Sequence, residues 1–231
     1  MNSPEVPVDS ASSVMVLRPG THPFEVLMVE RPNRGFFGGI VVFPGGKVDD
    51  VDDSELARHV VTGESDDQLY RRAALRELAE ETGLAAVGTG VIAFPPARDE
   101  ELYLAIKQSN QRLAGESLVL VSRWVTPELA PRRFDTWFYL LEAGMTPRIQ
   151  LDSDELVGFA WVTPAEALRR YDEGEWQMIL PTLAHLRWLR RRASIEDAMT
   201  AAQGADGRTL IEPRRMEDGS ILPIHLPGDN T

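Results

Sequence analysis

The feature that most constrains the fold of this chain is an amphipathic helix predicted over residues 67–82. Asp66 or Asp67 can cap its start, acidic residues lie in its first turn, and Gly83 can end it in the left-handed conformation. One face carries an inward stripe made of Tyr70, Ala74, Leu75, Leu78 and Thr82. Because such a stripe must be buried against another element, the helix is expected to cover one face of a sheet.

The rest of the chain mixes short apolar runs with helical patterns, in no regular strand–helix–strand order. Strands are predicted at 13–17, 24–29, 40–43, 87–93, 118–126, 134–141 and 158–162, with a further edge strand at 221–226. Further helices are predicted at 55–61, within 95–115, from 164 onward, at 180–193 and at 195–203. Gly45 and Gly46 are expected in a turn after 40–43 that another group approaches closely. This order predicts an α/β fold of the α+β type, in which helices cover both faces of a mixed sheet.

Three segments are distinguished along the chain. Residues 1–12 are expected to be a flexible N-terminus, 13–203 the folded domain, and 204–231 a tail that packs on it. Within the domain, 47–67 holds eight acidic and two basic residues and is interpreted as a solvated insertion. The length of 231 residues suits one domain with extensions.

Composition excludes several kinds of site. With 24 basic and 36 acidic residues the net charge is −12, which argues against nucleic-acid binding over a broad surface. The absence of cysteine excludes disulfides, thiolate metal sites and a cysteine nucleophile. No apolar run is long enough to span a membrane and no secretory signal is visible, so a cytoplasmic protein is expected.

Three glutamates stand out on the helix 67–82. Glu77, Glu80 and Glu81 follow the spacing i, i+3 and i+4, which places their carboxylates on one face. Like charges in this arrangement repel each other unless a cation neutralises them. Mg²⁺ and Mn²⁺ take oxygen ligands, so the cluster is a candidate site for either ion, although a solvated acidic face remains the alternative.

The glycines of 45–46 and the run RELAEETGL at 76–84 together resemble the Nudix box, G-x5-E-x7-R-E-U-x-E-E-x-G-U, where U is aliphatic. The resemblance implies a Nudix-like α/β/α sandwich and an enzyme that cleaves a nucleoside diphosphate linked to another moiety. It implies metal ligation by Glu77, Glu80, Glu81 and the carbonyl oxygen of Gly45, and an ion pair made by Arg76 that holds the helix to the preceding loop. Bound metal would neutralise the diphosphate and activate water.

The box departs from its usual form before the helix. Far more residues than usual separate Gly46 from Arg76, so the acidic segment 47–67 lies inside the motif. The position eight residues before Arg76 is Gln68 instead of glutamate, which removes the usual acidic partner of the arginine. Glu64 and Asp67 are the candidates to replace it.

Relatives of this kind often recruit another acid from a late loop, and Glu155 occupies such a position. It is expected either to complete the metal site or to act as general base, with a surface role as the alternative. Glu81 is the rival base, and Asp99, Glu100 and Asp135 are weaker candidates.

Two segments bear on the substrate. Residues 29–46 are loosely similar to the extra motif of coenzyme A diphosphatases, although the spacing differs by a residue and several positions disagree. Residues 123–138 resemble the branch that includes peroxisomal coenzyme A diphosphatases, whose members also carry a long insertion in the box. Candidate substrate contacts are Arg31, Arg34, Arg132 and Arg133 for phosphates, and Trp124 and Phe134 for stacking. Strand packing is the alternative for the aromatic residues, and a surface role is the alternative for Arg31 and Arg34.

Function is therefore expected to be Mg²⁺- or Mn²⁺-dependent pyrophosphohydrolysis, with coenzyme A or acyl-coenzyme A as the first choice of substrate. ADP-ribose, NADH and nucleotide sugars are alternatives, and a non-catalytic nucleotide-sensing domain is the second class. By analogy with other members, a homodimer is possible.

Overall fold

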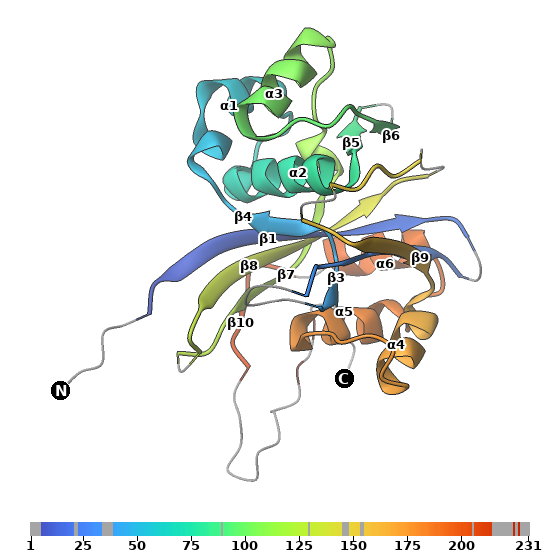
Figure 1. Cartoon of the computed structure of the whole chain (residues 1–231). Coiled ribbons are helices and arrows are strands. Elements are labelled where there is room, and N and C mark those ends of the chain that lie inside the picture. The colour runs from blue at the N-terminus through green and yellow to red at the C-terminus, as the bar shows by residue number, and fades with distance from the viewer. Residues whose placement is uncertain are drawn as a thin grey trace, which may run out of the picture.

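One mixed sheet forms the centre of the molecule (Figure 1). The computed structural model describes residues 6–20, 23–33, 39–88, 90–128, 130–144, 148–152, 155–204 and 206–213, with Ile224 and Leu226. The sheet contains β1 (Val8–Arg18), β2 (Glu25–Glu30), β3 (Val41–Val42), β4 (Gly45–Lys47), β7 (Val119–Val125), β8 (Arg133–Glu142), β9 (Gly158–Val162) and β10 (Leu210–Ile211). A separate hairpin is formed by β5 (Leu84–Val87) and β6 (Gly90–Ala93).

Strand β1 occupies the middle of the sheet. It pairs in parallel with β8 over its whole length from Val8 to Leu17, and antiparallel with β2 and β4 on its other edge. Strands β7 and β10 continue the sheet beyond β8, and β3 and β9 both pair with β2. Because β2 and β4 share one edge of β1, the segment that joins β3 to β4 enters the sheet between β1 and β2, and carries Gly45 into its centre.

Helices cover both faces of this sheet (Figure 1). The upper layer in Figure 1 contains α1 (Glu55–Val60), α2 (Gln68–Thr82) and α3 (Asp99–Gln108), and the lower layer contains α4 (Pro164–Asp172), α5 (Leu180–Leu189) and α6 (Ile195–Gln203). The alternation along β1 serves both layers, since Val14 and Val16 pack with the upper core while Met15 and Leu17 pack with the lower one. This arrangement confirms the predicted α+β class with helices on both faces.

Helix α2 follows its sequence signals closely but not completely. It ends at Gly83, whose φ of +67° is the predicted left-handed cap, and it buries Ala74, Leu75 and Leu78. Asp67 stands at the N-cap position, but its side chain makes no capping bond, and the first turn contains no acidic residue. The predicted acidic first turn is therefore wrong, because the helix begins at Gln68, after the acidic residues.

Three other expectations need correction, and one strand was missed. Strand β1 begins at Val8, so the predicted flexible N-terminus is wrong for residues 8–12, which pair with β8 or β4. The predicted strand 87–93 is a hairpin that turns after Val87, and Gly45 and Gly46 lie in strand β4 instead of a turn. The short strand β10 was not predicted. Most of the predicted strand 221–226 lies outside the described residues, although Leu226 is buried in the lower core.

Candidate metal centre

The site forms where β4 passes beneath α2. Gly46 lies so close to α2 that a β-carbon at this position would meet the carboxylate of Glu77 at 2.5–2.6 Å. The backbone N–H of Gly45 donates a hydrogen bond to Oε2 of Glu81 at 2.9 Å. The close approach expected of these glycines is therefore an approach to the acidic face of α2.

Three carboxylates converge at this place. Oxygen atoms of Glu77, Glu81 and Glu155 all lie within 4.8 Å of one another, although Glu155 is far from α2 in the sequence. The backbone brings it there: the N–H of Asp152 donates to the carbonyl of Glu81 at 3.2 Å, and the N–H of Glu155 donates to the carbonyl of Asp152 at 3.2 Å. We call Glu77, Glu81 and Glu155 the carboxylate cluster.

Glu80, the third glutamate expected from α2, is turned to other partners. Its Oε2 accepts a hydrogen bond from Nη1 of Arg76 at 3.1 Å, and its Oε1 accepts one from the backbone N–H of Asp99 at 2.6 Å. The carbonyl oxygen of Gly45 likewise accepts a hydrogen bond from Nη2 of Arg31 at 2.7 Å. The structure thus brings together two of the three expected helix ligands and adds Glu155, while metal ligation by Glu80 and Gly45 stays a prediction.

Arg76 is held by an acid that the sequence did not reveal. Its Nε and Nη2 form a forked ion pair with the fully buried carboxylate of Asp52, at 2.8 and 3.0 Å. Asp52 also accepts a hydrogen bond from the hydroxyl of Tyr103 at 2.8 Å, and Asp49 lies 3.4 Å from Arg76. The predicted ion pair therefore exists, but its acid comes from the short 3₁₀ helix Asp50–Asp53 inside the insertion.

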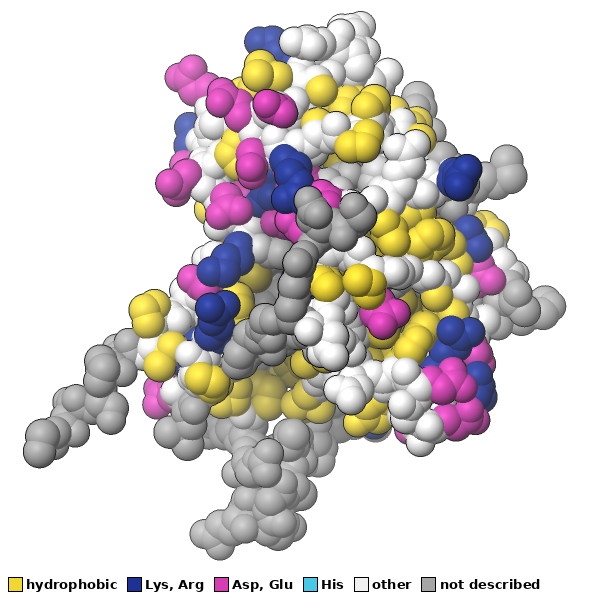
Figure 2. Space-filling model, viewed as in Figure 1, with side chains coloured by type: hydrophobic (Ala, Val, Ile, Leu, Met, Phe, Trp, Pro, Cys, Tyr) yellow, Lys and Arg dark blue, Asp and Glu magenta, His cyan; other side chains and the backbone are white. Residues whose placement is uncertain are grey.

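The two candidates for this pairing are wrong. Asp67 is fully buried but bonds instead to Nε of Arg71 and the hydroxyl of Tyr139, each at 3.0 Å. Glu64 is exposed. The interpretation of 47–67 as merely solvated is also wrong at Asp52 and Asp67, although Figure 2 shows other acidic side chains on the surface around α1. The only local signal was the Asp49-x-x-Asp52 spacing, which forms a capping box.

Burial raises the pKa of the two cluster members that α2 carries. Burial raises the pKa of Glu77 to about 7, although Arg76 opposes the effect, and it raises the pKa of Glu81 to about 8 despite the opposing charge of Arg31. The pKa of Glu80 is also raised by burial. Buried carboxylates that face each other and retain protons near neutral pH fit a divalent cation, whose charge compensates both desolvation and mutual repulsion.

The candidate substrate contacts fall into different environments. Arg31 lies at the cluster, with Nη2 at 3.3 Å from Oε1 of Glu81. Arg34 lies outside the described residues, and Arg132 is exposed. Arg133 is buried and its Nε donates to the carbonyl of Thr126 at 3.1 Å.

The aromatic candidates do not form a stacking platform together. Trp124 is buried in the lower core and donates from Nε1 to the hydroxyl of Ser122 at 3.0 Å, so its predicted stacking role is wrong and strand packing explains it. Phe134 is half-buried, with the ammonium of Lys47 6.0 Å from its ring centre. Among the weaker candidates for a base, Asp135 forms a two-point ion pair with Arg123 at 2.6 and 2.8 Å, which satisfies both of its oxygens.

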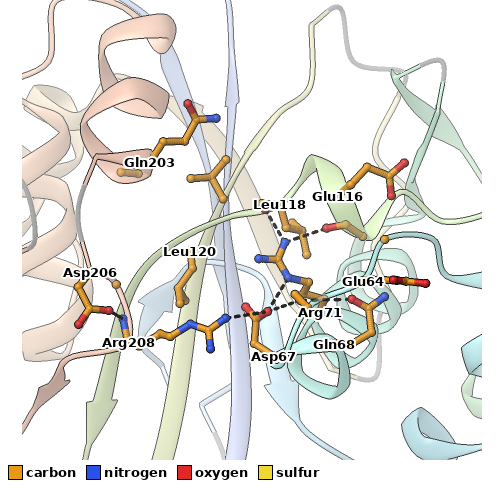
Figure 3. Close-up of a pocket in the computed structure, with 16 residues that line it drawn as sticks. Glu64, Asp67, Gln68, Arg71, Glu116, Leu118, Leu120, Gln203, Asp206 and Arg208 are labelled. Atoms are coloured by element: carbon orange, nitrogen blue, oxygen red, sulfur yellow. Dashed lines mark hydrogen bonds and ion pairs between the residues drawn. The ribbon is translucent and has the colours of Figure 1, made fainter.

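A separate cavity of about 440 Å³ lies between the acidic insertion and the segment that follows α6 (Figure 3). Figure 3 shows Arg208 and Arg71 reaching towards Asp67 from opposite sides. Arg208 also pairs with Asp66 at 3.0 Å. No residue of the carboxylate cluster lines this cavity.

Comparison with known proteins agrees with this geometry. A family model described as the NUDIX domain matches residues 7–180, which is more than half of the chain. A Caenorhabditis elegans protein described as a nudix hydrolase is 28% identical over 77% of this chain, and the human acyl-coenzyme A diphosphatase NUDT19 is 26% identical over 78%. The alignments span only 59% and 64% of the lengths of these two relatives.

A solved structure gives a stronger likeness. The crystal structure of a NUDIX hydrolase from Alicyclobacillus acidocaldarius superimposes with a TM-score of 0.74 at 32% identity, covering 84% of this chain and 96% of that one. The carboxylate cluster at the glycine-lined strand, the family model and this structural likeness lead to one conclusion. The chain belongs to the Nudix family.

Proposed function

We propose that this protein is a divalent-cation-dependent hydrolase of diphosphate bonds in nucleotide-like substrates. One observation carries the proposal: Glu77, Glu81 and Glu155 place oxygens within 4.8 Å of one another, and the first two are buried. The hydrolase names of the relatives support the same reaction class. In the described part of the chain, no helix is both long and apolar enough to cross a lipid bilayer.

The side chains at the site have different proposed roles. Glu77 and Glu81 would hold the cation from α2, and Glu155 would close the site from the solvent side. A bound divalent cation supplies charge neutralisation of the diphosphate and acidification of water, which hydrolysis of a phosphoanhydride requires. Arg31, whose side chain is about one-third exposed, meets the phosphate charge beside Glu81. The side chain of Arg76 is 2% exposed and donates to Asp52 and to the carbonyl of Lys47, so we assign it the positioning of α2 against β4.

Two residues compete for the role of general base. Glu81 is fully buried and accepts the N–H of Gly45, which favours a ligand role. Glu155 is the most exposed member of the cluster and can reach solvent water, so we assign the base to Glu155. In E155Q, the acidic limb of the pH–rate profile, where the rate rises as the base loses its proton, should disappear, while Mn²⁺ binding weakens much less than in E81Q.

Acyl-coenzyme A is our first choice of substrate, because two of the relatives are named acyl-coenzyme A diphosphatases, at 26% and 23% identity. ADP-ribose, NADH and nucleotide sugars contain the same diphosphate and are the alternatives. Mg²⁺ and Mn²⁺ suit the all-oxygen donor set equally. A homodimer and a cytoplasmic location stay predictions.

The test is a substrate panel of coenzyme A, acyl-coenzyme A, ADP-ribose, NADH and a nucleotide sugar, each with Mg²⁺, Mn²⁺ or a chelator. We expect turnover that needs the cation and falls steeply in E77Q and E81Q, whereas E173Q, at the exposed residue that follows α4, retains wild-type rates. Turnover of ADP-ribose without turnover of coenzyme A would exclude our choice of substrate. Nucleotide binding without cleavage of any diphosphate would exclude the enzyme and favour a nucleotide sensor.

A further inference from the structure

Each carboxylate of the cluster has its own arginine. Nη1 of Arg76 lies 3.0 Å from Glu77, Nη2 of Arg31 lies 3.3 Å from Glu81, and Nη1 of Arg98 lies 2.7 Å from Glu155. Arg76 lies on α2, Arg31 is the residue after β2, and Arg98 is the residue before α3. The arginines compensate the cluster only in part, because Arg76 is shared with Asp52 and Glu80, and a cation that enters must share these carboxylates with arginines.

The three arginines differ in how firmly they are held. The side chain of Arg76 is 2% exposed and bound by the fork with Asp52, so it cannot leave without abandoning a buried charge. The side chain of Arg98 is 44% exposed and that of Glu155 is 40% exposed. An ion pair this exposed is weak and easily exchanged.

Arg98 has a second anchor that would survive such an exchange. Its Nε donates to Oδ2 of Asp152 at 2.8 Å, and its Nη2 contacts the same oxygen. The adjacent N–H of Asp99 is fixed to Glu80 at 2.6 Å, and Asp152 is tied to α2 through the backbone of Glu81. The guanidinium is therefore kept at the mouth of the cluster even if its Nη1 lets go of Glu155.

We propose that Arg98 exchanges partners when the site is loaded, releasing Glu155 for its role as base and binding a phosphoryl oxygen of the diphosphate while Asp152 holds it in place. The inference rests on the proposed function, because it assumes a diphosphate substrate. The guanidinium of Arg98 is planar and permanently charged, and release of Glu155 leaves its Nη1 able to donate to a phosphoryl oxygen. Arg98 therefore contributes to substrate affinity, and its positive charge beside the cluster weakens binding of the cation when substrate is absent.

The test compares R98Q and R98K with wild type. The matched control is R169Q on α4, because Arg169 is 45% exposed and pairs with three carboxylates, those of Glu166, Glu173 and Glu175, on the opposite face of the sheet from the cluster. Mn²⁺ affinity is measured by electron paramagnetic resonance without substrate, binding of ADP in the presence of Ca²⁺ by calorimetry, and KM and kcat with the best substrate of the panel.

For R98Q we expect KM and the Kd for ADP to rise about tenfold, which corresponds to the loss of one charge-assisted hydrogen bond. The Kd for Mn²⁺ should fall about threefold, because the positive charge of the Arg98 guanidinium no longer lies beside the cation site. R98K should recover part of the substrate affinity, and R169Q should match wild type in all three measurements. The proposal is overturned if R98Q leaves KM and ADP binding unchanged, or if R98Q weakens Mn²⁺ binding, which would make Arg98 only a support for Glu155. If wild type cleaves no diphosphate, the proposed function fails, and ADP and Mn²⁺ binding still decide whether Arg98 exchanges.

Discussion

Two buried acids at opposite ends of α2 show how a carboxylate becomes either scaffold or site. Asp67 precedes the helix and Glu81 lies in its last turn, and both are almost completely excluded from solvent. Burial alone would raise both pKa values, but hydrogen bonds from Arg71, Ser65 and Tyr139 bring the pKa of Asp67 below its usual range. Glu81 has Arg31 and one backbone N–H, and its pKa rises to about 8.

Asp67 and Glu81 differ in how completely hydrogen-bond donors surround each carboxylate. Around Asp67, the protein supplies a full set of partners for an anion, so the charge is permanently satisfied. Around Glu81, part of the compensation is missing and neighbouring acids point to the same place. An incomplete set of donors beside like charges is thus a better indication of a cation site than acidity or burial alone.

The largest expected effect that tests this comparison is on catalysis. E81Q should lower kcat/KM by about 10³-fold, because a neutral amide cannot hold the cation that the reaction needs. D67N should retain cation-dependent turnover, since the Asp67 carboxylate is bound by Arg71 and Tyr139 and lies outside the carboxylate cluster. The measurement is steady-state hydrolysis with saturating Mn²⁺, and near-normal rates for E81Q would remove Glu81 from the site.

A slightly smaller effect is expected on stability when the forked ion pair between Arg76 and Asp52 is broken. D52N should lower the free energy of unfolding by about 3 kcal/mol, because it leaves the buried Arg76 guanidinium without its charged partner. D53N is the matched control next in the chain, and its exposed carboxylate should contribute little. Urea denaturation gives both values, and equal effects of the two variants would mean that the fork does not anchor the helix.

The pH dependence of stability should separate the two acids. A carboxyl group whose pKa rises on folding binds its proton more tightly in the folded state than in the unfolded state. The metal-free protein should therefore lose stability as the pH increases from 5 to 8. The contribution of Glu81 to this loss is about 3 kcal/mol. E81Q should flatten this slope. Urea denaturation with a chelator at several pH values measures it, and a slope that E81Q leaves unchanged would contradict the assignment.

The contribution of Asp67 to the pH dependence of stability should have the opposite sign, and it is the smallest effect expected. Because its pKa is lowered on folding, it stabilises the protein above its unfolded pKa, and this contribution is lost as pH falls. D67N should therefore cost about 2 kcal/mol at pH 7 and much less near pH 3, since it removes the partner of Arg71 and Tyr139. Thermal melts at both pH values test this, with E64Q as the exposed control from the same acidic segment.

The sequence was most informative where local rules apply. The period of the apolar stripe and Gly83 predicted α2 to within a residue, and the motif at 76–84 predicted the family. Asp52 was beyond reach because eight acids in 47–67 look alike, and only the tertiary path of the chain decides which of them is buried beside Arg76. Trp124 was misassigned for the same reason, since a strand residue's face is set by its partners.

The parallel pairing of β1 with β8 also has a consequence for how the protein is made. The two strands come from distant parts of the chain, and β1 leaves the ribosome long before β8 exists. Until then, one whole edge of β1, with its run of buried residues from Ala11 to Leu17, lacks its final partner. Loop closure over such a distance is slow, so folding should be limited by this step. Nascent chains that end before β8 should accordingly bind chaperones and aggregate, whereas chains that contain it should fold.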